Sequence, residues 1–272
     1  MSDSSVGDRI RVRPPAVAGA FYPATPDAIR EAIHEAFAAA VPRQHDAPLP
    51  KALVVPHAGY MYSGAIAASA YERIVPARST IRRVVLLGPS HRAYVRGLAA
   101  PSVDAFETPL GLVPIDTAAR AAVLALPGVE IDNRAHADEH SLEVQLPFLQ
   151  TVLDDFTLLP LSVGEATTDE VAAVLQECWG GPETLIVIST DLSHYHNYDE
   201  AVSLDARTAA AIVSCRSDAI DDLDACGAHP VRGLLHVACD HGLTVEQLDL
   251  RNSGDTAGDH HRVVGYGAFA VA

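Results

Sequence analysis

Three histidines follow short apolar runs of the chain at similar distances. His57 comes after KALVV, His91 after RVVLL and His194 after LIVI. Each has glycine, serine or proline close by, as is common in loops that approach a ligand. Imidazole is the commonest side-chain metal ligand and also transfers protons near neutral pH. The shared placement therefore indicates one common site for metal binding or acid–base chemistry.

Asp191 lies three residues before His194 in the segment STDLSHY. A carboxylate at this spacing could orient the imidazole and fix its tautomer. It could equally cap the helix or turn that follows. The residues alone leave both roles open.

A second pattern, His136-x-x-Glu139-His140, matches the H-x-x-E-H motif of inverted zinc peptidases. In those enzymes two imidazoles on one helix bind Zn²⁺ and the glutamate acts as general base. Here His136 lies in the polar run RAHADEH, close to the expected start of a helix, and Pro147 interrupts the pattern. A zinc hydrolase would also leave the three histidines after the apolar runs without a role, so this is the weaker hypothesis.

The elements that must position these residues are strands that alternate with helices. The three apolar runs lack polar alternation, which is typical of parallel strands covered on both faces. Helical spacing of apolar residues occurs at about 28–40, 64–73, 116–126, 139–153, 168–178 and 199–214. The sequence therefore predicts an α/β fold, a three-layer α/β/α domain with a central, mostly parallel sheet. Ligands bind at the carboxyl ends of the strands in such sheets.

The chain has 272 residues and no low-complexity tract or long linker that would divide it. Residues 10–272 are therefore predicted to form a single domain, whereas the small and polar residues 1–9 are expected to be frayed or disordered. The formal net charge of −16 disfavours binding to nucleic acid or to anionic membranes. No apolar run reaches the ~18 residues of a membrane span, and the start lacks an apolar signal core.

The cysteines provide one further indication of compartment. The chain has four, namely Cys178, Cys215, Cys226 and Cys239, and none forms a C-x-x-C pair. Reduced thiols are the default for such a pattern, and together with the missing signal core this predicts a cytoplasmic protein.

An ordered set of motifs runs from about residue 11 to the C-terminus. It comprises RPPAVAGAFYP, VVPHAGYMYSG, LLGPSH, FETPLG, EHSLEVQLPFL, ISTDLSHY, CGAHP and NSGDTAG. This set resembles the Memo family, also called AmmeMemoRadiSam system protein B. The resemblance implies the fold of class III (LigB-type) extradiol dioxygenases, which are non-haem iron enzymes.

The resemblance implies three metal ligands, His57 of PHAGY, His91 of GPSH and Cys226 of CGAHP. Two neutral imidazoles and one anionic ligand on a single face of a metal leave positions for substrate and O₂. Here the anion is a thiolate instead of the carboxylate of the dioxygenases, which argues against cleavage of catechol rings. Fe²⁺ is the first expectation for the metal, and copper or zinc is also compatible with these ligands.

The same resemblance implies the catalytic groups. His194 matches an acid–base histidine beside the metal, with Asp191 in support, and His140 resembles a histidine that faces the substrate. The residues expected to line the substrate pocket are Tyr22, Tyr60 and Glu143.

Two functions from different classes follow from this reading. The first is a metal-dependent oxidoreductase or dioxygenase-like enzyme that acts on a small molecule of unknown identity. The second is a non-catalytic protein that uses the same histidine pocket to bind a ligand or phosphopeptide. The family name also implies a radical SAM or AMMECR-type partner, and neither a nucleic acid nor a membrane is expected as a partner.

Overall fold

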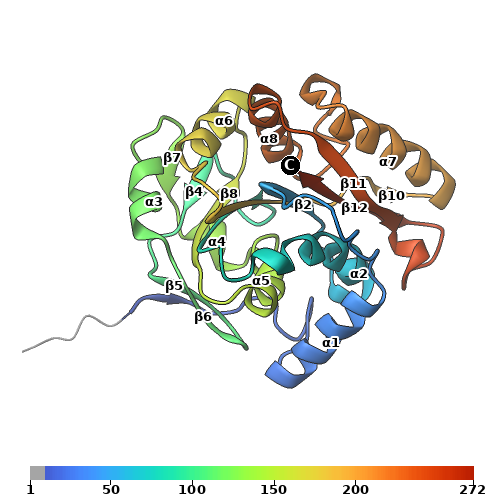
Figure 1. The fold of residues 1–272 in the computed structure, drawn as a ribbon, viewed down its shortest axis with the longest axis horizontal. Helices are drawn as coiled ribbons and strands as arrows, with labels where there is room; N and C mark the ends of the chain where they lie inside the picture. Colours follow the sequence, from blue (N-terminus) through green and yellow to red (C-terminus); the bar gives the residue numbers. More distant parts are fainter. Residues whose placement is uncertain (1–9) are drawn as a thin grey trace, which may run out of the picture.

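The computed structural model describes residues 10–272, so the segment 1–9, expected to be frayed, lies outside the described residues. A nine-stranded mixed sheet forms the centre of the molecule, and helices cover both of its faces (Figure 1). This arrangement confirms the predicted three-layer α/β/α fold.

The central sheet is parallel in its middle and antiparallel toward its edges. In the middle run β2 (Ala52–Val55), β9 (Thr184–Ser189), β3 (Arg83–Pro89) and β8 (Thr157–Val163), all mutually parallel. Antiparallel partners flank them, β12 (Val263–Val271) beside β2 and β4 (Leu98–Ala100) beside β8. The remaining strands are β7 (Val129–Ile131), parallel to β4, and β10 (His194–His196) and β11 (Val245–Asn252), both antiparallel to β12. The predicted mostly parallel character thus holds for the centre of the sheet.

Successive residues of the central strands supply two separate hydrophobic cores. In β2, Ala52 and Val54 belong to the core on one face of the sheet. Leu53 and Val55 belong to the core on the other face. All four are fully buried, which explains why this run is apolar throughout instead of alternating with polar residues.

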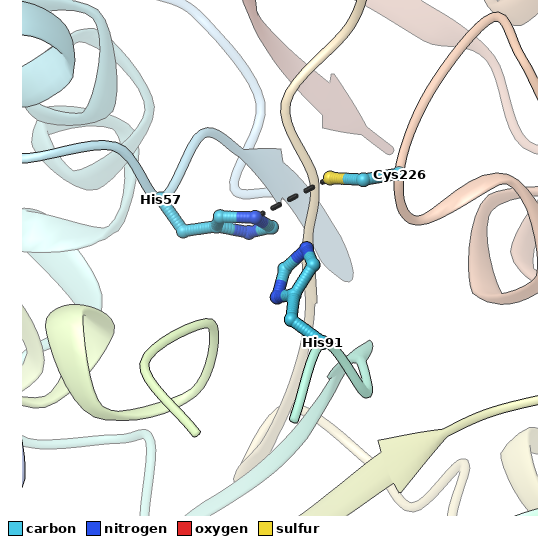
Figure 2. Close-up of side chains that lie close together, drawn as sticks. All are labelled: His57, His91 and Cys226. Carbon is cyan, nitrogen blue, oxygen red and sulfur yellow. Dashed lines mark hydrogen bonds between the residues drawn. The ribbon is translucent and has the colours of Figure 1, made fainter. Parts of the chain in front are cut away.

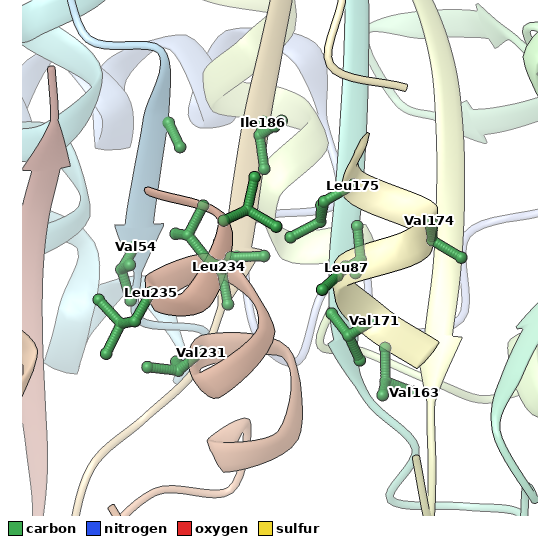
Figure 3. Packing of buried hydrophobic residues seen from close by; sticks show 14 of the residues in the cluster. Val54, Leu87, Val163, Val171, Val174, Leu175, Ile186, Val231, Leu234 and Leu235 are labelled. Carbon is green, nitrogen blue, oxygen red and sulfur yellow. The ribbon is translucent and has the colours of Figure 1, made fainter. Parts of the chain in front are cut away.

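Helices on the two faces enclose these cores. On one face lie α3 (Thr117–Val123), α6 (Thr168–Glu177), α7 (Tyr198–Val213) and α8 (Ala228–Asp240). Figure 3 shows Val171 and Leu175 of α6, with Leu234 of α8, packed over the strands. On the other face lie α1 (Pro26–Ala38), α2 (Tyr60–Tyr71) and α5 (Leu146–Val152). Most predicted helices agree with these to within a few residues, but the helix predicted at 139–153 begins only at Leu146, and α8 was not predicted.

Shorter elements complete the chain. A three-stranded sheet contains β1 (Val12–Arg13), β5 (Ala105–Thr108) and β6 (Gly111–Pro114). Short helical segments are η1 (Glu72–Ala77), α4 (Arg134–Ala137), η2 (Glu143–Gln145), η3 (Ser217–Ala219) and η4 (Ser253–Asp255). Residues 14–22 after β1, called the strap below, reach α2, where Tyr60 N–H donates to the Phe21 carbonyl at 2.8 Å.

None of the helices in residues 10–272 is long and apolar enough to cross a membrane.

Candidate metal centre

Three side chains from distant parts of the chain converge at the carboxyl ends of the central strands. His57 follows β2, His91 follows β3, and Cys226 lies in the loop before α8. Their potential ligand atoms all lie within 4.8 Å of one another. Figure 2 shows both imidazole rings and the thiol directed at the same space, with His57 Nε2 3.3 Å from Cys226 Sγ. The set is the one that the resemblance to the Memo family implies as metal ligands.

The hydrogen bonds around His57 determine its tautomer. Ser189 Oγ donates its only hydrogen to the Ser141 carbonyl at 2.6 Å. The hydroxyl must therefore accept from its other partners, Gln145 Nε2 at 2.8 Å and His57 Nδ1 at 2.9 Å. His57 thus carries its proton on Nδ1, and its Nε2 lone pair faces Cys226. Burial lowers the pKa of His57 well below its usual value, and His91 and His140 add to the effect.

Glu139 orients His91 in a similar way. Its carboxylate accepts from His91 Nδ1 at 2.9 Å, and also from the backbone N–H groups of His91, His140 and Ser141. Burial alone would raise the pKa of Glu139, but the hydrogen bonds from His91 and Ser141 lower it to about 2. An ionised carboxylate only accepts, so His91 holds its proton on Nδ1 and keeps Nε2 free for a metal. Carboxylates behind metal-binding histidines have this same role.

Cys226 is held where the loops after β9 and before α8 meet. The backbone N–H of Asp191 donates to its sulfur at 3.3 Å, and the hydroxyl of Thr190 lies 3.8 Å away. Burial, reinforced by the charge of Asp191, raises the pKa of the thiol to about 12. A bound cation reverses this effect, because it favours the thiolate.

The Asp191 carboxylate contacts His57, and no hydrogen bond between it and His194 is found among the residues described. Its Oδ1 accepts from the backbone N–H of His57 at 2.7 Å, and its Oδ2 lies 4.0 Å from His57 Nε2. The hydrogen bonds of this carboxylate therefore do not support its expected role of orienting His194. Burial raises the pKa of Asp191 to about 7. Burial also lowers the pKa of His194, which keeps this imidazole neutral.

A cavity of about 850 Å³ opens above the converging side chains. His140 lines it together with His57, His91, Asp191 and His194. The His140 ring stacks on His91 with centroids 4.7 Å apart and meets His57 edge-on at 5.4 Å. Burial lowers the pKa of His140 to about 4. Burial therefore favours the neutral form of three of the imidazoles that line the cavity, His57, His140 and His194.

Three residues expected to line the substrate pocket lie elsewhere. Glu143 is fully buried, pairs with Arg13, and accepts from the hydroxyl of Tyr22 at 2.6 Å and from the backbone of the strap. Tyr60 donates to the Val144 carbonyl at 2.8 Å. Tyr22 and Tyr60 line a neighbouring cavity of about 510 Å³. The buried Glu143 carboxylate is paired with the buried Arg13. It holds the strap in place, and it does not line the cavity beside His57 and His91.

The cavity instead has lining residues that the sequence did not single out. They are Phe21, Tyr62, Arg92, Tyr195, Arg262 and Tyr266, among others. Phe21 packs against His140 with ring centroids 4.5 Å apart. The sequence could have indicated these lining residues only by their position, since most lie within a few residues of the histidines or of Tyr22 and Tyr60.

The H-x-x-E-H motif does not form a zinc site with both of its histidines. Helix α4 ends at Ala137, before Glu139, so the motif does not lie on one helix. His136 is 2% exposed, and its Nε2 donates to the Ala99 carbonyl at 2.9 Å. Among the residues described, Glu139 and His140 group with His91 as a potential metal-binding set, without His136.

The fold and these side chains define a class of protein. Its members have three layers, α/β/α, and carry imidazole and thiol groups at the carboxyl ends of the parallel strands. Among solved structures, an uncharacterized protein of Escherichia coli K12 has a similar fold, with a TM-score of 0.50. The two are 14% identical over 80% of this chain and 99% of that one. At this identity the similarity concerns the fold alone.

Sequence comparison places the chain more narrowly. The family model described as Memo-like protein matches residues 13–270. A MEMO1 family protein of Aquifex aeolicus is 36% identical over 272 residues, covering 94% of this chain and 98% of the relative. A relative in Methanopyrus kandleri is 36% identical over 284 residues, with the same coverage. The chain belongs to the Memo family.

Proposed function

We propose that the protein is a metal-dependent oxidoreductase whose metal is held by His57, His91 and Cys226. The observation that supports this most is the tautomer of each imidazole. Ser189 and Glu139 each occupy one Nδ1, so both histidines direct an Nε2 lone pair toward the thiol. Two nitrogen donors and one sulfur donor suit Fe²⁺, which we propose first, and also copper or zinc.

The donor set fits such a metal because it is held in place before the metal binds. A bound Fe²⁺ would supply open coordination positions for a substrate and O₂. The residues of the chain would bind and orient the substrate and exclude water from the buried floor at His57. His194, which is neutral and lines the cavity, would accept a proton from the substrate. His140, stacked on His91, would form the wall against which the substrate rests.

Metal analysis of the anaerobically purified full-length protein tests this proposal. We expect close to one equivalent of iron or copper, lost in the His57→Ala and Cys226→Ser variants. The matched control is Cys239→Ser, because Cys239 is an exposed free thiol outside the centre. Screening O₂ consumption with catechols and thiols then tests for turnover.

Other outcomes identify the competing functions. Protein without metal, whose His57 and Cys226 variants change only in ligand affinity, would indicate the non-catalytic ligand- or phosphopeptide-binding function. Zinc that is lost on His136→Ala but kept in Cys226→Ser would indicate a hydrolase.

A further inference from the structure

Two arginine side chains line the cavity, and neither has an acidic partner for its guanidinium group among the residues described. Arg92 lies in the loop after β3 and Arg262 immediately before β12, and both line the cavity. Within residues 10–272, neither guanidinium forms an ion pair with a carboxylate. Other arginines of this acidic chain do so, for example Arg83 with Asp116 at 2.7 Å and Arg232 with Asp222 at 2.6 Å. The unpaired guanidinium groups therefore keep their hydrogen-bond donors for a ligand.

The backbone at Tyr195 brings an aromatic ring to the same place. Tyr195 has φ 64°, a left-handed conformation that costs energy for a residue other than glycine. It interrupts the pairing of β10 with β12, where the register shifts between His194 and His196. Successive strand residues normally face opposite sides, but this bulge lets both His194 and Tyr195 line the cavity.

Tyr195 in turn positions one of the arginines. The Arg262 guanidinium lies 4.9 Å from the centre of the Tyr195 ring, within the range of a cation–π contact. Tyr195 is 62% exposed, so the pair lies on the outer part of the cavity, whereas His57 at its floor is 2% exposed. Arg262 is thus placed at the entrance of the cavity. Arg92 is exposed as well, although it directly follows His91 in the chain.

The local charge favours a singly charged anion. Asp259 is the acidic residue of the outer lining, and its carboxylate accepts from the backbone N–H groups of His261 at 2.7 Å and Arg262 at 3.3 Å. Two arginines against this one acid make the entrance positive on a protein of net charge −16. The surrounding negative field disfavours a dianion more than a monoanion.

We infer that the molecule bound in this cavity carries a carboxylate, which Arg92 and Arg262 bind at the entrance while its other end reaches His57 and His91. This inference rests on the proposed function in one respect, namely that the cavity above the metal ligands is the substrate site. Arginine is suited to the task because its planar fork of N–H groups matches a carboxylate.

Calorimetric titration of the full-length protein with benzoate tests the inference. Benzamide has the same shape without the charge, so we expect benzoate to bind more tightly than benzamide. Each of Arg92→Gln and Arg262→Gln should weaken benzoate binding by about tenfold, the usual effect of losing one hydrogen bond to a charged group. The matched control is Arg30→Gln, an exposed arginine on α1 away from the cavity, which should leave benzoate binding unchanged.

A second set of titrations separates this inference from the metal centre. In the His57→Ala variant the proposed metal site is incomplete, so benzoate cannot bind to a metal there. Adding Arg92→Gln or Arg262→Gln to this variant should still weaken benzoate binding by about tenfold. Metal content should be the same in the arginine variants as in the unaltered protein. A protein that holds no metal but keeps the preference for benzoate would contradict the proposed function and support the carboxylate site.

Several results would overturn the inference. They are equal affinities for benzoate and benzamide, the absence of saturable benzoate binding, and an equal loss of benzoate affinity in Arg30→Gln. Tighter binding of phenyl phosphate than of benzoate would overturn the assignment of a carboxylate.

Discussion

The Glu139 carboxylate accepts hydrogen bonds from two groups of His91, the imidazole ring and the backbone N–H. It also accepts from the backbone N–H groups of His140 and Ser141. Glu139→Gln would replace one carboxylate oxygen by an NH₂ group that donates, which opposes these donors. We expect metal affinity to fall by roughly ten- to a hundredfold, although the three ligands remain. Competition with a chelator measures the change.

The control for Glu139→Gln is Glu165→Gln, an exposed glutamate whose carboxylate accepts only from the Tyr94 hydroxyl among the side chains described. The prediction is contradicted if both variants bind the metal as the unaltered protein does. Rescue by Glu139→Asp, even in part, would show that the charge behind His91 is what matters.

His136 makes stability depend on pH. Burial lowers the pKa of this imidazole from 6.5 to about 4, so between these values the unfolded chain takes up a proton that the folded protein does not. The free energy of unfolding therefore falls as the pH decreases from 6.5 toward 4, by up to about 3 kcal/mol. In His136→Gln this contribution disappears, and urea denaturation at a series of pH values should show a flatter profile.

The control for His136→Gln is His34→Gln, because His34 is exposed on α1. It should keep the slope of the unaltered protein. The same slope in His136→Gln would mean that another group is responsible for the acid sensitivity. His57, His140 and His194 are also buried with lowered pKa values, so some dependence on pH should remain in every variant.

Among the secondary-structure elements, α6 and α8 pack closely against each other at Gly233. A methyl group added at Gly233 of α8 would lie 2.3 Å from Val171 Cγ1 of α6. Gly233→Ala should therefore lower the free energy of unfolding by about 1–3 kcal/mol through overpacking. Combining it with Val171→Ala should recover part of that loss, and a double-mutant cycle from urea denaturation measures the coupling.

Gly64→Ala provides the control for the helix contact. In α2 the added methyl group would meet Tyr60 and Ala36 at ordinary distances of 3.5 and 3.6 Å. Because glycine is unfavourable inside a helix, this change should stabilise the protein by about 0.5–1 kcal/mol. Equal effects of the two substitutions would contradict the packing argument.

The sequence predicts some elements well and others not at all, for physical reasons. The apolar runs at β2, β3 and β9 are recognisable because both faces of each strand are covered. Helix α8 was not predicted, since Pro230 and Gly233 interrupt its pattern and only the partner helix explains the glycine. The order of the strands depends on contacts between residues far apart, which local patterns do not encode.

Some residues of the candidate site were likewise predicted from the sequence, and others were not. The proposed metal ligands were implied by the resemblance to the Memo family, and the residues alone indicated only the histidines that follow strands. Cys226 has no signal of its own outside the CGAHP motif. The position of Glu143 was predicted wrongly, since its pairing with Arg13 spans more than a hundred residues. The arginines of the entrance were missed, because an exposed arginine has no local signature that separates a ligand contact from a solvated side chain.

In the molecule as a whole, the proposed metal ligands belong to three distant segments. A metal bound by His57, His91 and Cys226 would link β2, β3 and the start of α8 in the folded protein. Binding to the folded state alone stabilises by about 2.7 kcal/mol at a free metal concentration of a hundred times the Kd. Removal of the metal with a chelator should therefore lower Tm, as measured by calorimetry.

Cys226→Ser provides the reference for this measurement. Chelator should shift its Tm little, because one ligand is already lost, whereas Cys239→Ser should behave as the unaltered protein does. A chelator effect of the same size in Cys226→Ser would place the stabilising metal elsewhere.

The position of β12 has a consequence for biosynthesis. During translation Cys226 is synthesised long after His57 and His91. Strand β12, which lies between β2 and the strands β10 and β11, is synthesised later still. Until Val263–Val271 has been synthesised, one side of β2 has unpaired backbone groups, and such edges pair with other chains. A nascent chain that stalls before this strand would contain every proposed ligand of the metal and still lack the complete sheet that holds them together.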